Sequence, residues 1–221
     1  MDQNFLNLWK LNDGLVKLVI ESEHDDYVKH LPADADAVSN IVEGWRNAPA
    51  FMSPAIYNAQ GQALGTVCVA ARVAIGNAND LDKAREKASR FAVPASAVIT
   101  SYRDICVVFA FSKLAPFDDI YTRLCQKVNL LLTVNGAQYI EKPSDAERLI
   151  RVPGSQLLRN YVQSADDPRG LRLTHASASE PVTVEMNPTM PKYEFSDLVK
   201  TIGVVGVRRP AYSTGILKSV S

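Results

Sequence analysis

Carboxylate pairs are the first residues of this chain whose spacing suggests chemistry. Asp34 and Asp36 are separated by one residue, which resembles a metal-binding pair. They directly precede a stretch with helical periodicity that contains Val38, Ile41 and Val42. Acids in this position more often accept hydrogen bonds from the free N–H groups of the helix and interact favourably with its dipole. We therefore predict helix capping here rather than a metal site.

Cysteine and histidine patterns give no sign of zinc binding or nucleophilic catalysis. The chain contains three cysteines and three histidines: Cys68, Cys106 and Cys125, and His24, His30 and His175. No CxxC, HxxxH or HExxH spacing occurs, and the cysteines lie in apolar runs, so we expect buried free thiols in a reducing compartment. Cys106 has no nearby histidine in the sequence to act as its base. The phosphate-cradling GxxxxGK[ST] motif, GxGxxG and GxSxG are also absent from the sequence.

The composition is that of an ordinary globular chain. It has 221 residues, 47% of them hydrophobic, with 24 basic and 24 acidic side chains. Disordered and collagen-like chains are excluded, and the zero net charge excludes overall attraction to nucleic acid, although not a local basic surface. No apolar run approaches the roughly 20 residues of a membrane span, and the N-terminus lacks a cleavable apolar core. We expect a cytoplasmic protein with no membrane partner.

Helices and strands alternate irregularly along the chain, which predicts an α+β fold with a mixed sheet. A helix or helix–strand pair is expected within residues 6–20, and strands at 55–58 and 67–75. A helix ending before Pro94 precedes strands 97–100 and 105–111, which are joined by the polar turn 101–104. A long helix begins after Asp118, and a short strand at 182–185 precedes a short helix near 195–202. In strand 67–75, Arg72 shares one face with Ala74 and Gly76.

Residues 48–159 resemble the archaeo-eukaryotic primase superfamily, the primase-polymerases of many plasmid and phage replication proteins. The resemblance lies in the order of these elements and in one motif, Asp145-x-x-Arg148-x-x-Arg151-x-Pro153-Gly154-Ser155. It implies a primase-polymerase-like core in which helices flank a mixed sheet that includes an RRM-like module of the catalytic type. It also implies a domain over residues 1–163, with a helical, acidic part at 1–50 and a core at 51–163. Residues 164–221 are then a C-terminal extension with a short strand and helix, partly disordered.

The family's catalytic positions hold the wrong residue types in this chain. Members of the family use a carboxylate pair on one strand, a histidine on the second strand of the hairpin and a later acid to bind two divalent ions and a nucleotide. Here the pair falls on Ala74 and Gly76, and the histidine on Cys106. Asp145 is the one acid that could survive, or it is a structural acid before the motif. The resemblance thus implies a catalytically degenerate member with no metal and no catalytic residue.

A shift in the alignment does not restore the missing pair. Asp80 and Asp82 lie a few residues downstream, but they fall in the predicted helix. Residues two apart on a helix point about 200° away from each other, so both carboxylates cannot face one ion. Capping of the helix is the better interpretation.

Several basic residues fall where the family brings positive charge towards nucleotide or template phosphate. The resemblance implies a nucleotide-binding or nucleic-acid-binding role for six of them: Arg72, Arg103, Lys142, Arg148, Arg151 and Arg159. The alternative is ordinary surface charge or a structural pair such as Arg148 with Asp145. A positive Arg72 beside the missing acids would occupy space that an ion holds in the family, consistent with loss of catalysis.

Three functions follow as hypotheses. The first is a non-catalytic primase-polymerase-like domain in the replication of a plasmid, phage or other mobile element, which binds single-stranded or primed DNA or a replication partner. The second is an active DNA primase or polymerase that uses Mg²⁺ or Mn²⁺ with differently placed carboxylates, Asp145 among them. The third is a protein-interaction domain that binds a helicase, polymerase or initiator and no DNA. No cofactor is expected under the first and third hypotheses.

Overall fold

The chain is described from a computed structural model. The described residues are 3–10, 14–21, 26–45, 48–74, 78–100, 104–133, 149–158, 161–162, 172–173, 179–181, 183–187 and 189–203. The helices are α1 Gln3–Leu6, α2 Ala35–Gly44, α3 Ala78–Ser89, α4 Asp119–Leu132 and α5 Phe195–Ile202. The strands are β1 Leu15–Ile20, β2 Tyr27–Pro32, β3 Ala50–Tyr57, β4 Ala63–Ala74, β5 Ala97–Thr100, β6 Asp104–Ala115, β7 Ile150–Arg151, β8 Gln156–Leu158, β9 Tyr161–Val162, β10 Arg172–Leu173, β11 Ser179–Pro181, β12 Thr183–Met186 and β13 Lys192–Tyr193.

One mixed sheet organises the described part of the chain. It has nine strands there, in the order β12-β5-β6-β4-β3-β1-β2, with β7 beside β3 and β13 beside β6. All of its pairings are antiparallel except that of β13 with β6. Two pairs of short strands, β9 with β10 and β8 with β11, lie outside this sheet. The predicted α+β fold with a mixed sheet flanked by helices is confirmed.

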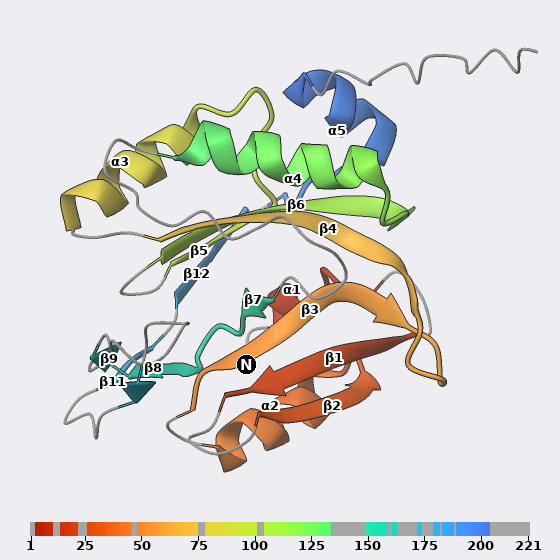
Figure 1. Ribbon diagram of the computed structural model, residues 1–221, viewed down its shortest axis with the longest axis vertical. Coiled ribbons are helices and arrows are strands. Elements are labelled where there is room, and N and C mark those ends of the chain that lie inside the picture. Colours follow the sequence, from red (N-terminus) through yellow and green to blue (C-terminus); the bar gives the residue numbers. More distant parts are fainter. Residues whose placement is uncertain are drawn as a thin grey trace, which may run out of the picture.

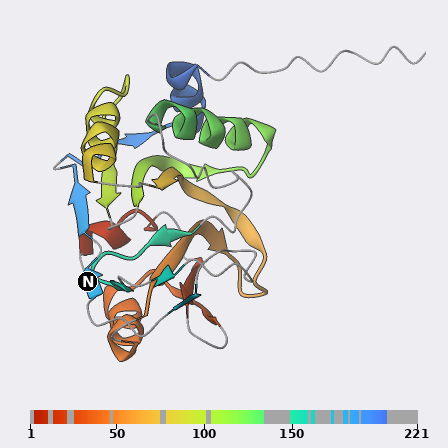
Figure 2. The same cartoon turned by 60° about the vertical axis from the view of Figure 1, so that its left-hand side comes forward.

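Strand β4 belongs to two halves of the sheet. Its first residues pair with β3, and it pairs with β6 at Thr66 and again from Cys68 onwards, with a shift in register between these two residues. We call β4 from Cys68, β5, β6, β12 and β13 the helix-covered half, and β1, β2, β3 and β7 the hairpin half. Figures 1 and 2 show α3, α4 and α5 above the helix-covered half and the hairpin half below it. The two halves therefore face each other on the side away from α4.

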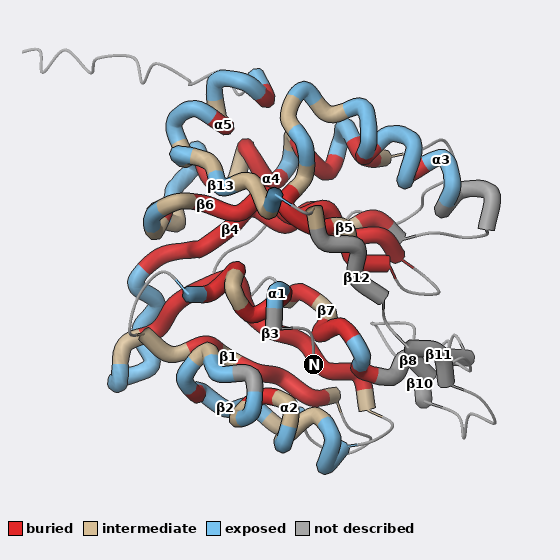
Figure 3. The backbone as a smooth tube through the Cα atoms, turned by 180° about the vertical axis from the view of Figure 1, so that it is seen from behind, coloured by how far each residue is buried: buried red, intermediate tan, exposed pale blue. Residues whose placement is uncertain are grey.

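Alternation of side chains along β4 and β6 creates two hydrophobic cores. Cys106 and Val108 belong to the first core, together with Trp9 and Met52 from the hairpin side. The residues that alternate with them, including Val107, belong to a second core beneath α3, α4 and α5. Figure 3 shows the resulting buried path along both strands. The buried free cysteines are confirmed, and the predicted alternation of faces is confirmed from Cys68 to Val73. Val67, predicted on the face opposite Cys68, instead belongs to the same core as Cys68, because the register is irregular between Thr66 and Cys68.

Local expectations hold at several element boundaries. The Asp34 carboxylate accepts a hydrogen bond from the Ala37 backbone N–H at 2.9 Å and caps α2, as predicted. The predicted hairpin is formed by β5 and β6, with Thr100 opposite Ile105. Asp104, expected in its turn, is instead the first residue of β6 and is 6% exposed. Strand β6 therefore begins with a carboxylate on the sheet.

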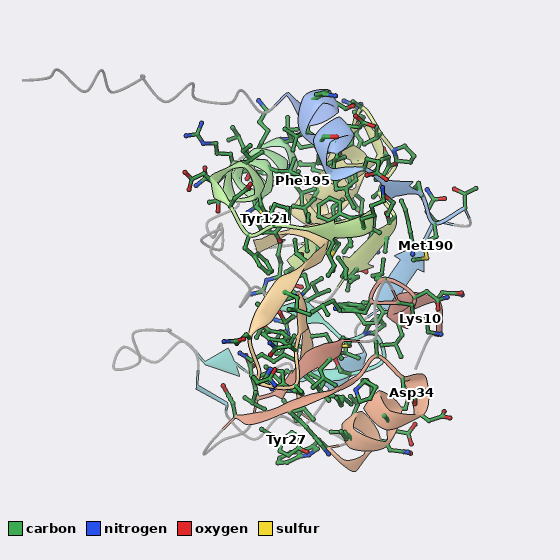
Figure 4. The ribbon with its side chains drawn as sticks, turned by 90° about the vertical axis from the view of Figure 1, so that its right-hand side faces the viewer. Lys10, Tyr27, Asp34, Tyr121, Met190 and Phe195 are labelled. Atoms are coloured by element: carbon green, nitrogen blue, oxygen red, sulfur yellow. The ribbon has the colours of Figure 1, made fainter. Side chains whose placement is uncertain are left out.

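The C-terminal elements complete the helix-covered half. Strand β12 extends the sheet beside β5, and β13 lies parallel to β6. The Ser96 hydroxyl donates to the Pro191 carbonyl at 2.5 Å and accepts the Ala110 N–H at 2.8 Å. Figure 4 shows Phe195 on the side of α5 that faces the sheet, and its ring centre lies 5.5 Å from that of Phe111. Leu198 is buried in the second core, so α5 forms part of its cover.

No helix within the described residues is both long and apolar enough to cross a membrane.

Asn129 is a polar residue on the buried face of α4. Its side chain is 1% exposed, and among the described residues neither its Oδ1 nor its Nδ2 has a hydrogen-bond partner. An unsatisfied buried amide carries an uncompensated desolvation cost, and leucine has the higher helix propensity. Asn129→Leu should therefore raise the free energy of unfolding by about 1–3 kcal/mol, measured by urea denaturation. Asn129→Asp should lower it, because a charge is then buried; a destabilising Asn129→Leu would contradict the expectation.

Tyr121 links α4 to β4 and makes stability depend on alkaline pH. Its hydroxyl donates to the Cys68 carbonyl oxygen at 3.3 Å, on the sheet side of α4 (Figure 4). Burial raises the pKa of Tyr121 well above its usual value, and the nearby Cys125 and Cys68 raise it further. Above pH ~10 the unfolded chain loses this proton while the folded chain retains it, so stability falls as pH rises. Urea denaturation should show a smaller fall for Tyr121→Phe; an equal fall in both proteins would contradict this.

Candidate functional site

Positions 72 and 74 of β4 and positions 104 and 106 of β6 lie together on the face of the sheet that is turned away from α4. We call these four positions the patch. Arg72 lies opposite Cys106, and position 74 lies opposite Asp104. Cys106 contacts the first core, and the two-residue alternation places Asp104 on the same face. Diagonal neighbours on paired strands lie about 7–8 Å apart, within reach of a long side chain. Arg72 and Asp104 are such a diagonal pair.

Asp104 connects two arginines from different parts of the fold. Its Oδ2 lies 3.6 Å from the Nε of Arg72 and accepts a hydrogen bond from the Nε of Arg151 at 3.0 Å. The side chains are 8% exposed for Asp104, 18% for Arg72 and 13% for Arg151. We call these three residues the Asp104 network. Because Arg151 belongs to β7 and Asp104 to β6, the network joins the hairpin half to the helix-covered half.

Arg151 is held in one orientation by its surroundings. Its guanidinium carbon lies 4.8 Å from the ring centre of Phe51, which is the cross-strand neighbour of Arg151 and is 3% exposed. The contacts of its guanidinium group within the described residues are this ring and Asp104, and both terminal amino groups lack an acceptor there. A planar guanidinium anchored through Nε, with its terminal N–H groups available, matches the bidentate geometry of a phosphate oxyanion.

The Pro-Gly-Ser part of the motif forms the turn that ends β7. The Ser155 backbone N–H donates to the Val152 carbonyl at 3.1 Å, and the Ser155 hydroxyl donates to the same oxygen at 2.6 Å. Gly154 has φ of +81°, a left-handed conformation that glycine adopts without the steric cost of a side chain. The turn therefore redirects the chain directly after Arg151 and defines where its strand ends.

The described residues do not fit a two-ion catalytic site. Asp104 is the carboxylate of the patch, and no group of three or more His, Cys, Asp or Glu side chains in the described part of the chain could hold a metal ion. Position 74 carries a methyl group and position 106 a buried thiol. A divalent ion about 4 Å from a guanidinium would be repelled by roughly 8 kcal/mol at an effective dielectric constant near 20. Among the described residues, Asp104 supplies the only carboxylate of the patch, and the guanidinium groups of Arg72 and Arg151 already flank it.

The structure brings together two of the predicted binding residues. Arg72 and Arg151 meet at Asp104, and Cys106 lies opposite Arg72. The remaining predicted positions lie outside the described residues: Gly76, Arg103, Lys142, Asp145, Arg148 and Arg159. At position 74 the backbone is described and its side chain is not.

Two residues of the site were missed in the sequence. Asp104 resembled a turn residue, although it stands two residues before Cys106 and so shares its face when the strand is extended by one residue. That spacing was the signal that could have identified it. Phe51 gave no signal, because its contact with Arg151 depends on the pairing of β3 with β7.

The sequence matches no protein-family model and no curated protein. The fold, however, is that of the archaeo-eukaryotic primases. The structure is similar to the primase domain of the primase-polymerase of cyanophage S-2L, with a TM-score of 0.59 and 12% identity over 90% of this chain and 94% of that chain. It is also similar to primase RepB', with a TM-score of 0.52 and 10% identity over 90% of this chain and 60% of that chain. These similarities establish the fold.

Removal of the central carboxylate should strongly destabilise the protein. Asp104→Asn leaves two largely buried guanidinium groups without their shared counter-charge, so the free energy of unfolding should fall by about 3 kcal/mol. Asp82→Asn is the matched control, because Asp82 is 78% exposed and lies 4.0 Å from Arg85, and it should cost less than about 0.5 kcal/mol. Urea denaturation measures both. Equal effects of the two substitutions would show that the Asp104 network contributes no stability.

Proposed function

We propose that this chain is a replication-associated primase-polymerase-like domain that binds nucleic acid and does not catalyse nucleotide transfer. The observation that carries the proposal is the Asp104 network, in which a guanidinium–carboxylate cluster stands on the sheet face where the family resemblance calls for metal-binding acids. The primase fold supports an association with replication. The lack of carboxylates at positions 74 and 76 argues against catalysis. The two arginines that Asp104 holds in place argue for phosphate binding.

Arg151 provides the strongest support for phosphate binding. It is largely buried, stacked on Phe51 and oriented by Asp104, so little side-chain entropy remains to be lost when an oxyanion binds. Arg72 adds a second guanidinium from the neighbouring strand. Arg103, Lys142, Arg148 and Arg159 remain predictions from the sequence, and they would extend the basic surface along a bound strand.

An active nucleotidyltransferase is the second candidate because one observation favours it. Asp104 is a carboxylate on the face of the sheet where the family binds metal, although on β6 instead of β4. Asp145 remains a possible second acid on sequence grounds. Under this alternative, divalent ions would have to displace both arginines from Asp104, against the repulsion described above.

A synthesis assay separates the two candidates. The purified chain is incubated with primed and unprimed templates, nucleoside triphosphates and either Mg²⁺ or Mn²⁺, with an active primase-polymerase as the positive control. We expect no extension and no primer synthesis. Synthesis that Asp104→Asn or Asp145→Ala abolishes would establish the active alternative and contradict the proposal.

Binding to single-stranded DNA should depend on salt and on Arg151. Its affinity should fall with increasing salt, and Arg151→Gln should weaken it by about 10- to 100-fold, as expected for loss of a charged hydrogen bond. Arg90→Gln is the matched control, because Arg90 is 73% exposed and pairs with Glu86 on α3. Fluorescence anisotropy measures affinity, and circular dichroism verifies that each variant is folded. Arg151→Lys, which retains charge but not the planar fork, provides a second variant if the glutamine variant does not fold.

The proposal fails if the folded protein binds no DNA at low salt, or if both glutamine variants bind as well as the parent. Co-purification with a helicase or polymerase, together with no DNA binding, would instead establish a protein-interaction domain.

A further inference from the structure

The Asp104 network carries more positive than negative charge. Within the described residues it contains two guanidinium groups and one carboxylate, all largely buried. Arg72 reaches Asp104 from the strand on which the family resemblance places its acid pair, two residues before Ala74. The arginine is therefore close to where a divalent ion would contact this face of the sheet.

A guanidinium can replace one of the two contributions of a divalent ion. Both neutralise the oxygens of a phosphate, and a guanidinium also donates directional hydrogen bonds to them. A guanidinium has no open coordination position, so it cannot bind an attacking hydroxyl and lower its pKa as a metal ion does. Such a replacement retains binding of the phosphate while removing the means to activate a nucleophile.

We propose that this site binds a phosphate group of a nucleotide, free or within a strand, without a divalent cation, and that Arg72 and Arg151 supply the positive charge. The inference deepens the proposed function and depends on it. Asp104 is the positioning residue, because it holds both guanidinium groups through their Nε atoms. The terminal amino groups of Arg151 then face the phosphate.

Divalent dependence of binding is the direct test. Affinities for a fluorescent nucleoside triphosphate and for a labelled single strand lacking a terminal phosphate are measured with EDTA, Mg²⁺ or Mn²⁺ at matched ionic strength. We expect each dissociation constant with a divalent ion to be equal to that in EDTA within about twofold, or weaker because the cation competes for phosphate. Binding of the triphosphate alone identifies a free nucleotide as the source of the phosphate, and binding of the strand identifies backbone phosphate.

Substitution of Arg72 tests the source of the charge. Arg72→Gln should weaken binding in EDTA by about tenfold and reduce the salt dependence by about one phosphate contact. Arg72→Lys retains the charge and should restore most of the affinity and the salt dependence of binding, whereas with a merely structural role Arg72→Gln would lower stability without changing the salt dependence. Arg90→Gln again serves as the control, and circular dichroism checks folding. If Arg72→Gln does not fold, Arg72→Lys and the divalent series with the parent protein still decide the question.

The outcomes distinguish this inference from the proposed function. Binding that becomes more than about tenfold tighter with Mg²⁺ or Mn²⁺ overturns the inference and leaves nucleic-acid binding intact. Divalent-independent binding that is unaffected by Arg72→Gln also overturns it. Absence of binding under every condition overturns both.

Discussion

A carboxylate shared by two arginines is the constraint on which the site depends. Each of the three charges is largely removed from water, and removing one partner of a buried ion pair is strongly destabilising. The carboxylate lies on β6, one guanidinium comes from β4, and the other comes from β7, which pairs with β3. The network thus connects the two halves of the sheet. It places two positive charges and one negative charge on this face.

The face that bears the network follows from the two-residue alternation in β4 and β6, and this part was accessible in the sequence. Arg72 could be placed on one face with Ala74 from spacing alone, and the hairpin of β5 and β6 could be recognised from its turn and flanking apolar runs. Asp104 was not recognised, because an acid after Ser101, Tyr102 and Arg103 is typical of a turn, and tertiary contacts with two arginines determine its place in the strand. Contacts over long sequence separations, such as that of Arg151 with Phe51, have no local signature.

Fold and chemistry are separable in this protein. The fold is similar to that of a solved primase-polymerase domain at 12% identity, because a sheet of this topology requires apolar alternation, turns and buried helix faces rather than particular residues. The chemistry depends on a few positions of the sheet surface. In the described part of the chain this surface carries two guanidinium groups on one carboxylate, and a core of buried apolar side chains lies on either side of the sheet.

The most direct measurement is a crystal structure of the chain grown with Mn²⁺ and a non-hydrolysable nucleoside triphosphate, recorded at a wavelength where manganese scatters anomalously. Our account predicts phosphate density at the terminal amino groups of Arg151 and beside Arg72, with the contacts of Asp104 to both arginines retained. An anomalous peak coordinated by Asp104, with the arginines displaced, would contradict it.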